Sequence, residues 1–294
     1  MRRFRYDTSN NWYKGNTHVH STASDGGMDF TQLSELYAGA GYDFLFRMDH
    51  SVSSDVEADT NDYPLLWLDG VELGGADHDG SSYHISCLGK VSGVEGQNGL
   101  MPNLELAREQ GAILILAHPA LLSNSIDEAL RHGFDGVEIY NHVAHWINGR
   151  SNSMFHWSMM LDHFPNTFAL ASDDTHCDAV CPGWNGGWIV VNAAECTRPA
   201  IMEAIRCGNF YASCGPDFRS IKCEGNQITA TTSPIQFARV VGPGWNSDRT
   251  GSFDGETFTE VTFEVPEDWG YAYLEIEDAQ GKRAWTNPLF VAEG

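Results

Sequence analysis

The chain has 294 residues, of which 42% are hydrophobic and 12% aromatic, which excludes a disordered chain and allows a sizeable buried core. This length suits one barrel with a small appended domain. The 17 Lys and Arg against 40 Asp and Glu give a formal charge of -23, and no basic run is present, so nucleic acid and anionic membranes are disfavoured as partners.

No apolar run approaches the roughly 20 residues that a membrane span needs. The basic residues near the N-terminus precede no apolar stretch, so no signal peptide is expected. Of the seven cysteines, only Cys177 and Cys181 come close to the spacing of a small metal knuckle, and no second pair completes one. We therefore expect reduced cysteines and a cytoplasmic protein.

Short apolar runs alternate with helical patterns along the first two-thirds of the chain. Continuous apolar character over a few residues favours strands that are buried on both faces, as in a parallel sheet. The alternation predicts an α/β barrel or a doubly wound sheet. The runs are residues 42–50, 65–73, 83–89, 112–119, 134–141, 167–174 and 186–193.

Three of the intervening segments carry clear helix signals. In the first, apolar residues recur at the i, i+3, i+4 and i+7 positions from Leu33. Ser125, followed three residues later by Glu128, matches the capping box at the start of a second helix. Pro199, two residues after Thr197, fits the first turn of a third helix.

Helical periodicity ends near residue 216, and apolar and polar residues alternate beyond it. This alternation predicts antiparallel strands with one buried face. The expected inward residues are Val261, Phe263 and Val265 in one strand and Ala272, Leu274 and Ile276 in another, with Tyr271 and Tyr273 on the opposite face. We therefore expect an α/β barrel over residues 1–216 and a small antiparallel β-sandwich over residues 217–294.

Polar residues with metal-ligand chemistry end or open most of the predicted strands. In barrels, the C-terminal ends of the strands converge on one face, where catalytic groups sit. Each residue alone has an ordinary explanation, such as a hydrogen-bonded histidine or an N-cap aspartate, but together they indicate a metal centre. The nine residues are His18, His20, Asp25, His50, Glu72, His84, His118, Asp174 and His176.

The spacing of the first three supports a shared role. Alternation along an extended segment places His18 and His20 on the same face. Asp25 lies in the turn SDGG, which is permissive enough to fold the carboxylate back toward the two histidines.

The ligand types constrain the metal and its chemistry. Imidazole and carboxylate without thiolate suit Zn, Mn or Fe, and suit Mg less well. Nine ligands exceed the four that tetrahedral zinc takes, so two or three divalent ions are expected, bridged by carboxylate or hydroxide. Such a cluster generates a hydroxide nucleophile near neutral pH and clamps the oxygens of a phosphoryl group. No nucleophile elbow and no phosphate-binding P-loop are present in the sequence.

These motifs resemble a known family. HVHSTASDG, MDH, GVE, YHISCLG, AHP and SDDTH, in this order, resemble the PHP (polymerase and histidinol phosphatase) superfamily. EIYN, SDDTH, GGWIVV, RCGNFYASCGP and AWTNPLFV are similar to its CehA/McbA-like branch, so that the resemblance covers essentially the whole chain.

The resemblance implies a distorted, TIM-like (β/α)7 barrel with a metal cluster, and hydrolysis of phosphoesters. It assigns metal binding to the nine residues above, and catalysis to all of them except His84. Met48 stands where the family usually has Thr before Asp-His. Asp173 and Asp174 are both candidates for the last carboxylate ligand, and the spacing to His176 favours Asp174.

Four polar residues near the EIYN run are candidates for binding substrate, namely Asn141, His142, His145 and Arg150. A guanidinium suits bidentate phosphate recognition, although Arg150 pairing with a surface carboxylate is an equal alternative. Trp184 could wall a pocket, but a core or loop role is favoured.

Three functions are therefore compared. The first is a metal-dependent phosphoesterase that acts on a small phosphoester. The second keeps the metal centre and hydrolyses a carboxylic or carbamic ester, because the branch includes carbamate-cleaving relatives. The third is a carbohydrate- or protein-binding module in which the metals only stabilise the fold.

Overall fold

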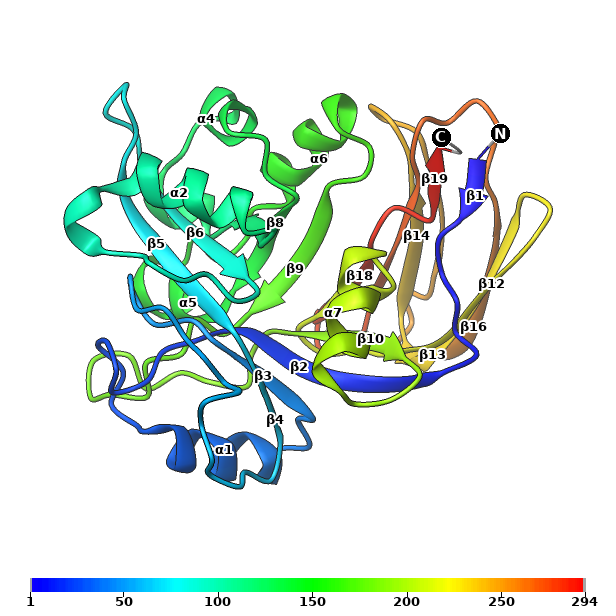
Figure 1. Cartoon of the computed structure of the whole chain (residues 1–294). Coiled ribbons are helices and arrows are strands. Elements are labelled where there is room, and N and C mark those ends of the chain that lie inside the picture. The colour runs from blue at the N-terminus through cyan, green and yellow to red at the C-terminus, as the bar shows by residue number, and fades with distance from the viewer. Residues whose placement is uncertain (1, 293–294) are drawn as a thin grey trace.

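The computed structural model describes residues 2–292 and shows a mixed α/β part beside a β-rich part (Figure 1). The two chain ends lie close together at the β-rich part, where β1 (Arg2–Phe4) pairs antiparallel with β19 (Phe290–Ala292). Tyr6 is buried in the core of the β-rich part, and its hydroxyl donates to the carbonyl of Phe210 at 2.7 Å. The first residues of the chain thus pack with its last strands.

The α/β part contains two groups of strands. A parallel trio consists of β2 (Asn11–Val19), β3 (Phe44–Arg47) and β4 (Leu66–Leu68). A five-stranded sheet consists of β5 (Gly70–Ala76), β6 (Ser82–Leu88), β7 (Ile113–Leu116), β8 (Gly136–Asn141) and β9 (Phe168–Ser172). The strands expected from the apolar runs are all present.

The expectation of parallel strands is wrong for β10 (Trp188–Ala193), which pairs antiparallel with β2. It is also wrong for β6, which pairs antiparallel with both β5 and β7. The reason is the short connection after β5, where the N–H of Asp77 donates to the carbonyl of Ser81 at 2.9 Å. A tight hairpin of this kind can join only antiparallel strands, because a parallel crossover needs a dozen or more residues.

Two isolated parallel bridges connect the trio to the five-stranded sheet. One joins Val19, at the end of β2, to Thr175, which lies beyond β9. The other joins His50, beyond β3, to Glu72 in β5. The trio therefore meets the five-stranded sheet at both edges of that sheet, and both junctions lie at candidate metal ligands.

Helices connect and cover these strands. They are α1 (Phe30–Gly39), α2 (Leu100–Glu109), α3 (Pro119–Leu122), α4 (Ile126–Arg131), α5 (His142–Asn148), α6 (Met154–His163) and α7 (Arg198–Arg206). The predicted capping box of α4 is confirmed, because the Ser125 side chain accepts from the N–H of Glu128 and the Glu128 carboxylate accepts from the N–H of Ser125. Thr197 is the N-cap of α7, but its side chain makes no capping hydrogen bond.

The β-rich part is a pair of sheets around a second apolar core. One sheet contains β12 (Phe218–Glu224), β13 (Gln227–Ile235) and β16 (Phe258–Glu264). The other contains β14 (Phe237–Val241), β15 (Ser247–Gly251), β17 (Tyr273–Glu277) and β18 (Arg283–Thr286). It continues through β11 (Phe210–Ser213) and β10 (Trp188–Ala193) into β2, so one nine-stranded sheet links the two parts.

The expectation of one buried face is wrong for the segment around β17. Leu274 and Ile276 point into the second core, as expected, but Tyr271 and Tyr273 are also buried. Tyr273 packs on Trp157 of α6, with ring centroids 4.6 Å apart. The opposite face of this strand is therefore covered by the α/β part, which the alternation of the strand alone could not reveal.

Candidate metal centre

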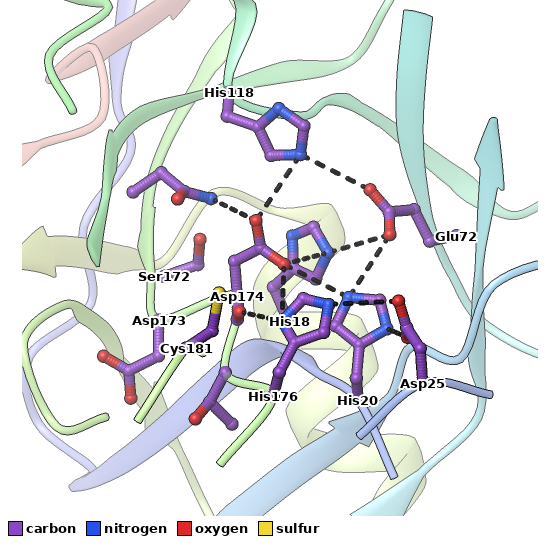
Figure 2. Close-up of polar contacts among 12 residues, drawn as sticks. His18, His20, Asp25, Glu72, His118, Ser172, Asp173, Asp174, His176 and Cys181 are labelled. Carbon is purple, nitrogen blue, oxygen red and sulfur yellow. Dashed lines mark hydrogen bonds and ion pairs between the residues drawn. The ribbon is translucent and has the colours of Figure 1, made fainter. Parts of the chain in front are cut away.

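The nine candidate ligands lie together at one end of the α/β part. His18 lies near the end of β2 and His20 directly beyond it, while Glu72 comes from β5 and His84 from β6. The others lie beyond strand ends and are Asp25 in the turn after β2, His50 after β3, His118 after β7, and Asp174 and His176 after β9. Figure 2 shows the inner members of this group pointing toward one another.

Glu72 is the centre of the group, with five imidazoles around its carboxylate. Its Oε2 atom lies 3.2 Å from His18 Nε2, 3.3 Å from His20 Nε2 and 3.0 Å from His50 Nδ1. Its Oε1 atom lies 2.9 Å from His84 Nδ1 and 3.5 Å from His118 Nε2. The Glu72 side chain is fully buried, and neither of its oxygens has a hydrogen-bond partner of good geometry within the described residues.

Asp174 closes the inner side of the group. Its Oδ1 atom lies 3.3 Å from His18 Nε2 and 3.1 Å from His20 Nε2, and its Oδ2 atom lies 3.6 Å from His118 Nε2. The same three imidazoles therefore contact both buried carboxylates, Glu72 and Asp174.

Asp25 defines the outer side. Its carboxylate lies 3.6 Å from His20, 3.7 Å from His50 and 3.4 Å from His176. The Asp25 side chain is 53% exposed, whereas the His18 and His20 side chains are fully buried. The cluster thus has a closed base and an open rim.

These separations fit ligands of common ions. Donor atoms bound about 2.0–2.2 Å from one ion lie roughly 3.0–3.5 Å from one another. Four overlapping sets have donor atoms within 4.8 Å of one another, and they are His18–Glu72–His118, His18–His20–Asp174, His50–Glu72–His84 and His20–Asp25–His50–His176. Glu72, His18, His20 and His50 are shared between sets, and the residues as a group fit divalent metal binding.

The electrostatics of the cluster also favour a cation. Burial alone would raise the pKa of Glu72, but the charge of His18 and the close contacts of the neighbouring imidazoles hold that pKa well below its usual value. Burial alone would lower the pKa of His20, but Asp174 and Glu72 raise it to about 9. Deeply buried carboxylates stay ionised only beside positive charge, which protonated imidazoles or bound cations supply.

The turn that carries Asp25 is fixed by Asp49. The Asp49 carboxylate accepts from the N–H and hydroxyl of Ser21, both at 2.8 Å, and from the hydroxyl of Ser24 at 2.7 Å. Gly26 is required in this turn, since a Cβ there would lie 2.5 Å from the carbonyl oxygen of His20. The turn thereby folds Asp25 back onto the histidines, as its sequence predicts.

Two of the inner residues have strained backbone. His118 has φ 31° and Asp174 has φ 55°, both in the left-handed region that non-glycine residues rarely adopt. Such strain costs of order 1–3 kcal/mol and is characteristic of functional sites.

Asp173 and Asp174 have separate environments. Asp173 accepts from the backbone N–H groups of residues 185, 186 and 187, from the Asn16 amide and from the Tyr37 hydroxyl. Figure 2 shows its side chain turned away from Asp174. Asp174 is therefore the carboxylate that lies in the cluster, and Asp173 holds the 185–187 loop.

Glu138 is a buried part of the site that the sequence reasoning did not assign. Its Oε1 atom lies 2.8 Å from His18 Nδ1, on the side of that ring opposite to the cluster. Its Oε2 atom accepts from the Asn141 side-chain amide at 3.0 Å. A carboxylate within the otherwise apolar run that ends in Asn141 is the signal that could have identified it.

The four candidate substrate residues lie in different places. Asn141 is buried and donates to Asp174 Oδ2 at 3.2 Å, while its own oxygen caps α5. His142 packs against the loop that contains Gly183 and Gly186, and its Nδ1 atom lies 3.2 Å from the Tyr140 hydroxyl. His145 and Arg150 are exposed, and Arg150 donates to the Ser123 hydroxyl.

Several other expectations concern residues outside the cluster. Trp184 packs on Tyr37, with ring centroids 5.4 Å apart, which agrees with a packing role. Cys177 and Cys181 are free thiols, and neither belongs to a ligand set in residues 2–292. Among the helices of the described chain, none has the length and apolar character of a membrane span.

Comparisons with known proteins give a fold but no family assignment. No family model matches the chain, and no curated protein matches it. A solved structure of a two-domain protein from Bacteroides vulgatus, described as containing a predicted PHP-like metal-dependent phosphoesterase, superimposes with a TM-score of 0.55 at 15% identity. The match covers 97% of this chain and 96% of that one. The two proteins therefore share a fold over both parts.

A second solved structure, of a proposed metal-dependent phosphoesterase from Bifidobacterium adolescentis, matches with a TM-score of 0.41 at 12% identity. This match covers 56% of this chain and 89% of that one.

Proposed function

We propose that this protein is a metal-dependent phosphoesterase of the PHP type, in the CehA/McbA-like branch, that hydrolyses a small phosphoester. Two or three divalent ions, Zn, Mn or Fe, would be held by the nine clustered side chains. Residues 1–216 would form the distorted (β/α)7 barrel of that family, with a separate β-sandwich over residues 217–294. The bridges at Val19–Thr175 and His50–Glu72 support the barrel, since they join both edges of the five-stranded sheet to the parallel trio.

The observation that carries the proposal is the environment of Glu72. A carboxylate that is fully buried, without a hydrogen bond of good geometry among residues 2–292 and with five imidazoles around it, is costly unless a cation compensates it. The solved structure that shares the fold is described as PHP-like and metal-dependent, which agrees with this reading.

The exposed fractions of the ligands indicate where a substrate would approach. The Asp25, His50 and His84 side chains are 53%, 32% and 34% exposed, whereas those of His18 and His118 are 0% and 2% exposed. A phosphoryl group would therefore approach over the rim formed by the first three residues, while the buried histidines hold the base of the site.

Bound divalent ions would supply Lewis acidity there, which activates water as a nucleophile and neutralises the phosphoryl oxygens. The chain supplies the arrangement of donors. His18, His20 and Asp174 are held rigidly at the base, and Glu72 lies between the inner and outer ligand sets. Rigid, pre-positioned donors avoid reorganisation during the reaction.

The test combines metal analysis with a substrate panel. Freshly purified protein should carry more than one transition-metal ion per chain by mass spectrometry and should cleave p-nitrophenyl phosphate or bis-p-nitrophenyl phosphate. Glu72→Gln should lose both metal and turnover, with Glu105→Gln on the exposed face of α2 as the matched control. Metal-replete protein that is silent on phosphate mono- and diesters would refute the phosphoesterase proposal.

Naphthyl esters and carbamates in the same panel address the alternative hydrolase. Turnover of these compounds without turnover of phosphoesters would replace the phosphoester assignment and leave the metal centre intact. Loss of thermal stability on chelation, without turnover of any compound in either state, would instead support a binding protein that is stabilised by metals.

A further inference from the structure

We propose that Glu138 is a positioning residue that holds the inner ligands of the cluster, so that its loss weakens the inner cation site selectively. The inner ligands are His18, His118 and Asp174, and Glu72 lies between these and the outer ligands. The outer ligands are Asp25, His50 and His176. This inference rests on the proposed metal centre and adds a division of labour within it.

The first contact of Glu138 fixes the tautomer of His18. Glu138 is buried, and its Oε1 atom lies 2.8 Å from His18 Nδ1. A carboxylate accepts at this distance, so the imidazole proton stays on Nδ1 and the Nε2 lone pair faces Glu72 and Asp174. Carboxylates that orient a ligand histidine in this way also increase its basicity.

The second oxygen of Glu138 holds the two strained residues. Oε2 accepts from the backbone N–H of His118 at 3.1 Å, and thereby stabilises the left-handed backbone from which that ring projects. It also accepts from the Asn141 amide at 3.0 Å, and the same amide donates to Asp174 Oδ2 at 3.2 Å. One carboxylate thus links ligands that come from the ends of three different strands.

Glu138 is itself fixed by its neighbours. The Ser172 hydroxyl donates to Oε1 at 2.7 Å, and Glu138 lies in β8 between β7 and β9. Within residues 2–292, it makes no hydrogen bond or ion pair with Asp25, His50 or His176, which are held through Asp49 and the loop after β9. The two ends of the cluster therefore have separate supports.

The experiment is a Zn²⁺ titration of the full chain in buffers of defined free zinc, in which mass spectrometry measures the metal bound per chain. The visible spectrum of the Co²⁺-substituted protein distinguishes binding at the inner site from binding at the outer site. Loss of such an orienting partner typically costs 10–100-fold in metal affinity. Glu138→Gln should therefore weaken one binding step by about 10–100-fold and leave the other within about threefold.

Two further variants define the assignment. Asp25→Ala should weaken the other step, and Asp77→Asn, which removes a buried carboxylate paired with Arg131, should weaken neither. Ser172→Ala removes only one support of Glu138 and should shift the same step as Glu138→Gln by less, so the inference stays testable even if Glu138→Gln does not fold.

Unchanged affinities in the folded Glu138→Gln and Ser172→Ala variants would overturn the inference, as would an equal weakening of both steps. A wild-type protein that binds no Zn²⁺ at all would overturn the proposed metal centre itself, which is a different result.

Discussion

Asp173 and Asp174 are neighbours in the chain, but their carboxylates face different networks. Asp173 is bonded to backbone N–H groups of the 185–187 loop, whereas Asp174 contacts His18, His20 and His118. Successive side chains of an extended segment point to opposite sides, which agrees with this divergence, and Asp174 itself has a left-handed backbone with φ 55°.

The two aspartates should therefore respond differently to the same substitution. Asp173→Asn replaces one carboxylate oxygen with an NH2 group, which would face N–H and O–H groups that need an acceptor. This change should lower the free energy of unfolding by about 2–4 kcal/mol. Asp174→Asn should lower metal content while the far-UV circular dichroism spectrum stays unchanged. Urea denaturation and metal analysis of both variants measure these effects, and equal metal loss in two equally stable variants would contradict the assignment.

Chelation should destabilise the wild-type protein. Ions bound only by the folded chain, at about 1,000 times their Kd, add about 4 kcal/mol, which at this size raises the Tm by about 10 °C. Without the ions, only the neighbouring imidazoles remain to compensate the charges of the two buried carboxylates, Glu72 and Asp174. Differential scanning fluorimetry before and after chelation measures the change, and Glu72→Gln should show little response. An unchanged Tm of the wild-type protein after chelation would contradict the prediction that bound metal stabilises the fold.

The convergence of the ligands was predictable because strand ends meet at one edge of an α/β fold. His118, Asp174 and His176 follow β7 and β9, so their proximity follows from the order of the strands alone. The turn at Asp25 was predictable from its glycines, since few residues other than glycine fit the contact at Gly26.

Other features depend on tertiary contacts that one sequence does not reveal. The role of Glu138 depends on the direction of its side chain and on the closeness of β2 to β8 in space. The burial of Tyr273 depends on Trp157, more than 100 positions away, because the α/β part covers a face that strand alternation assigns to solvent. Met48 is buried among apolar residues such as Phe46 and Leu68, which gives it a packing role.

The pair of Arg47 and Asp59 should make stability depend on pH. A hydrogen bond from the backbone N–H of Asn61, together with Arg47, lowers the pKa of Asp59 to about 2. An aspartate with a lowered folded-state pKa contributes stability that is complete above its unfolded pKa of about 4 and is lost as the pH falls through about 2.

The urea midpoints of wild type and Asp59→Asn test this dependence. The difference between the two proteins should be constant above about pH 5 and should shrink progressively between about pH 4 and pH 2. Arg47→Met should reduce the difference at neutral pH, because it removes one partner of Asp59. A difference that stays constant from pH 6 to pH 3 would show that the ionised carboxylate does not contribute.

Arg150 should affect substrate binding rather than metal binding. Its guanidinium is exposed and donates to Ser123, which lies five residues after His118 in the chain. If it also contacts the phosphoryl group, Arg150→Ala should raise KM about tenfold, the effect of losing one charge-assisted hydrogen bond of about 1.5 kcal/mol, with kcat and metal content unchanged. Arg150→Lys, which keeps the charge but not the planar fork, should give an intermediate KM.

Arg108→Ala is the matched control, since this exposed arginine donates to the carbonyl of His132 outside the cluster. Steady-state kinetics on p-nitrophenyl phosphate measure the effect, and an unchanged KM in Arg150→Ala would limit Arg150 to its contact with Ser123.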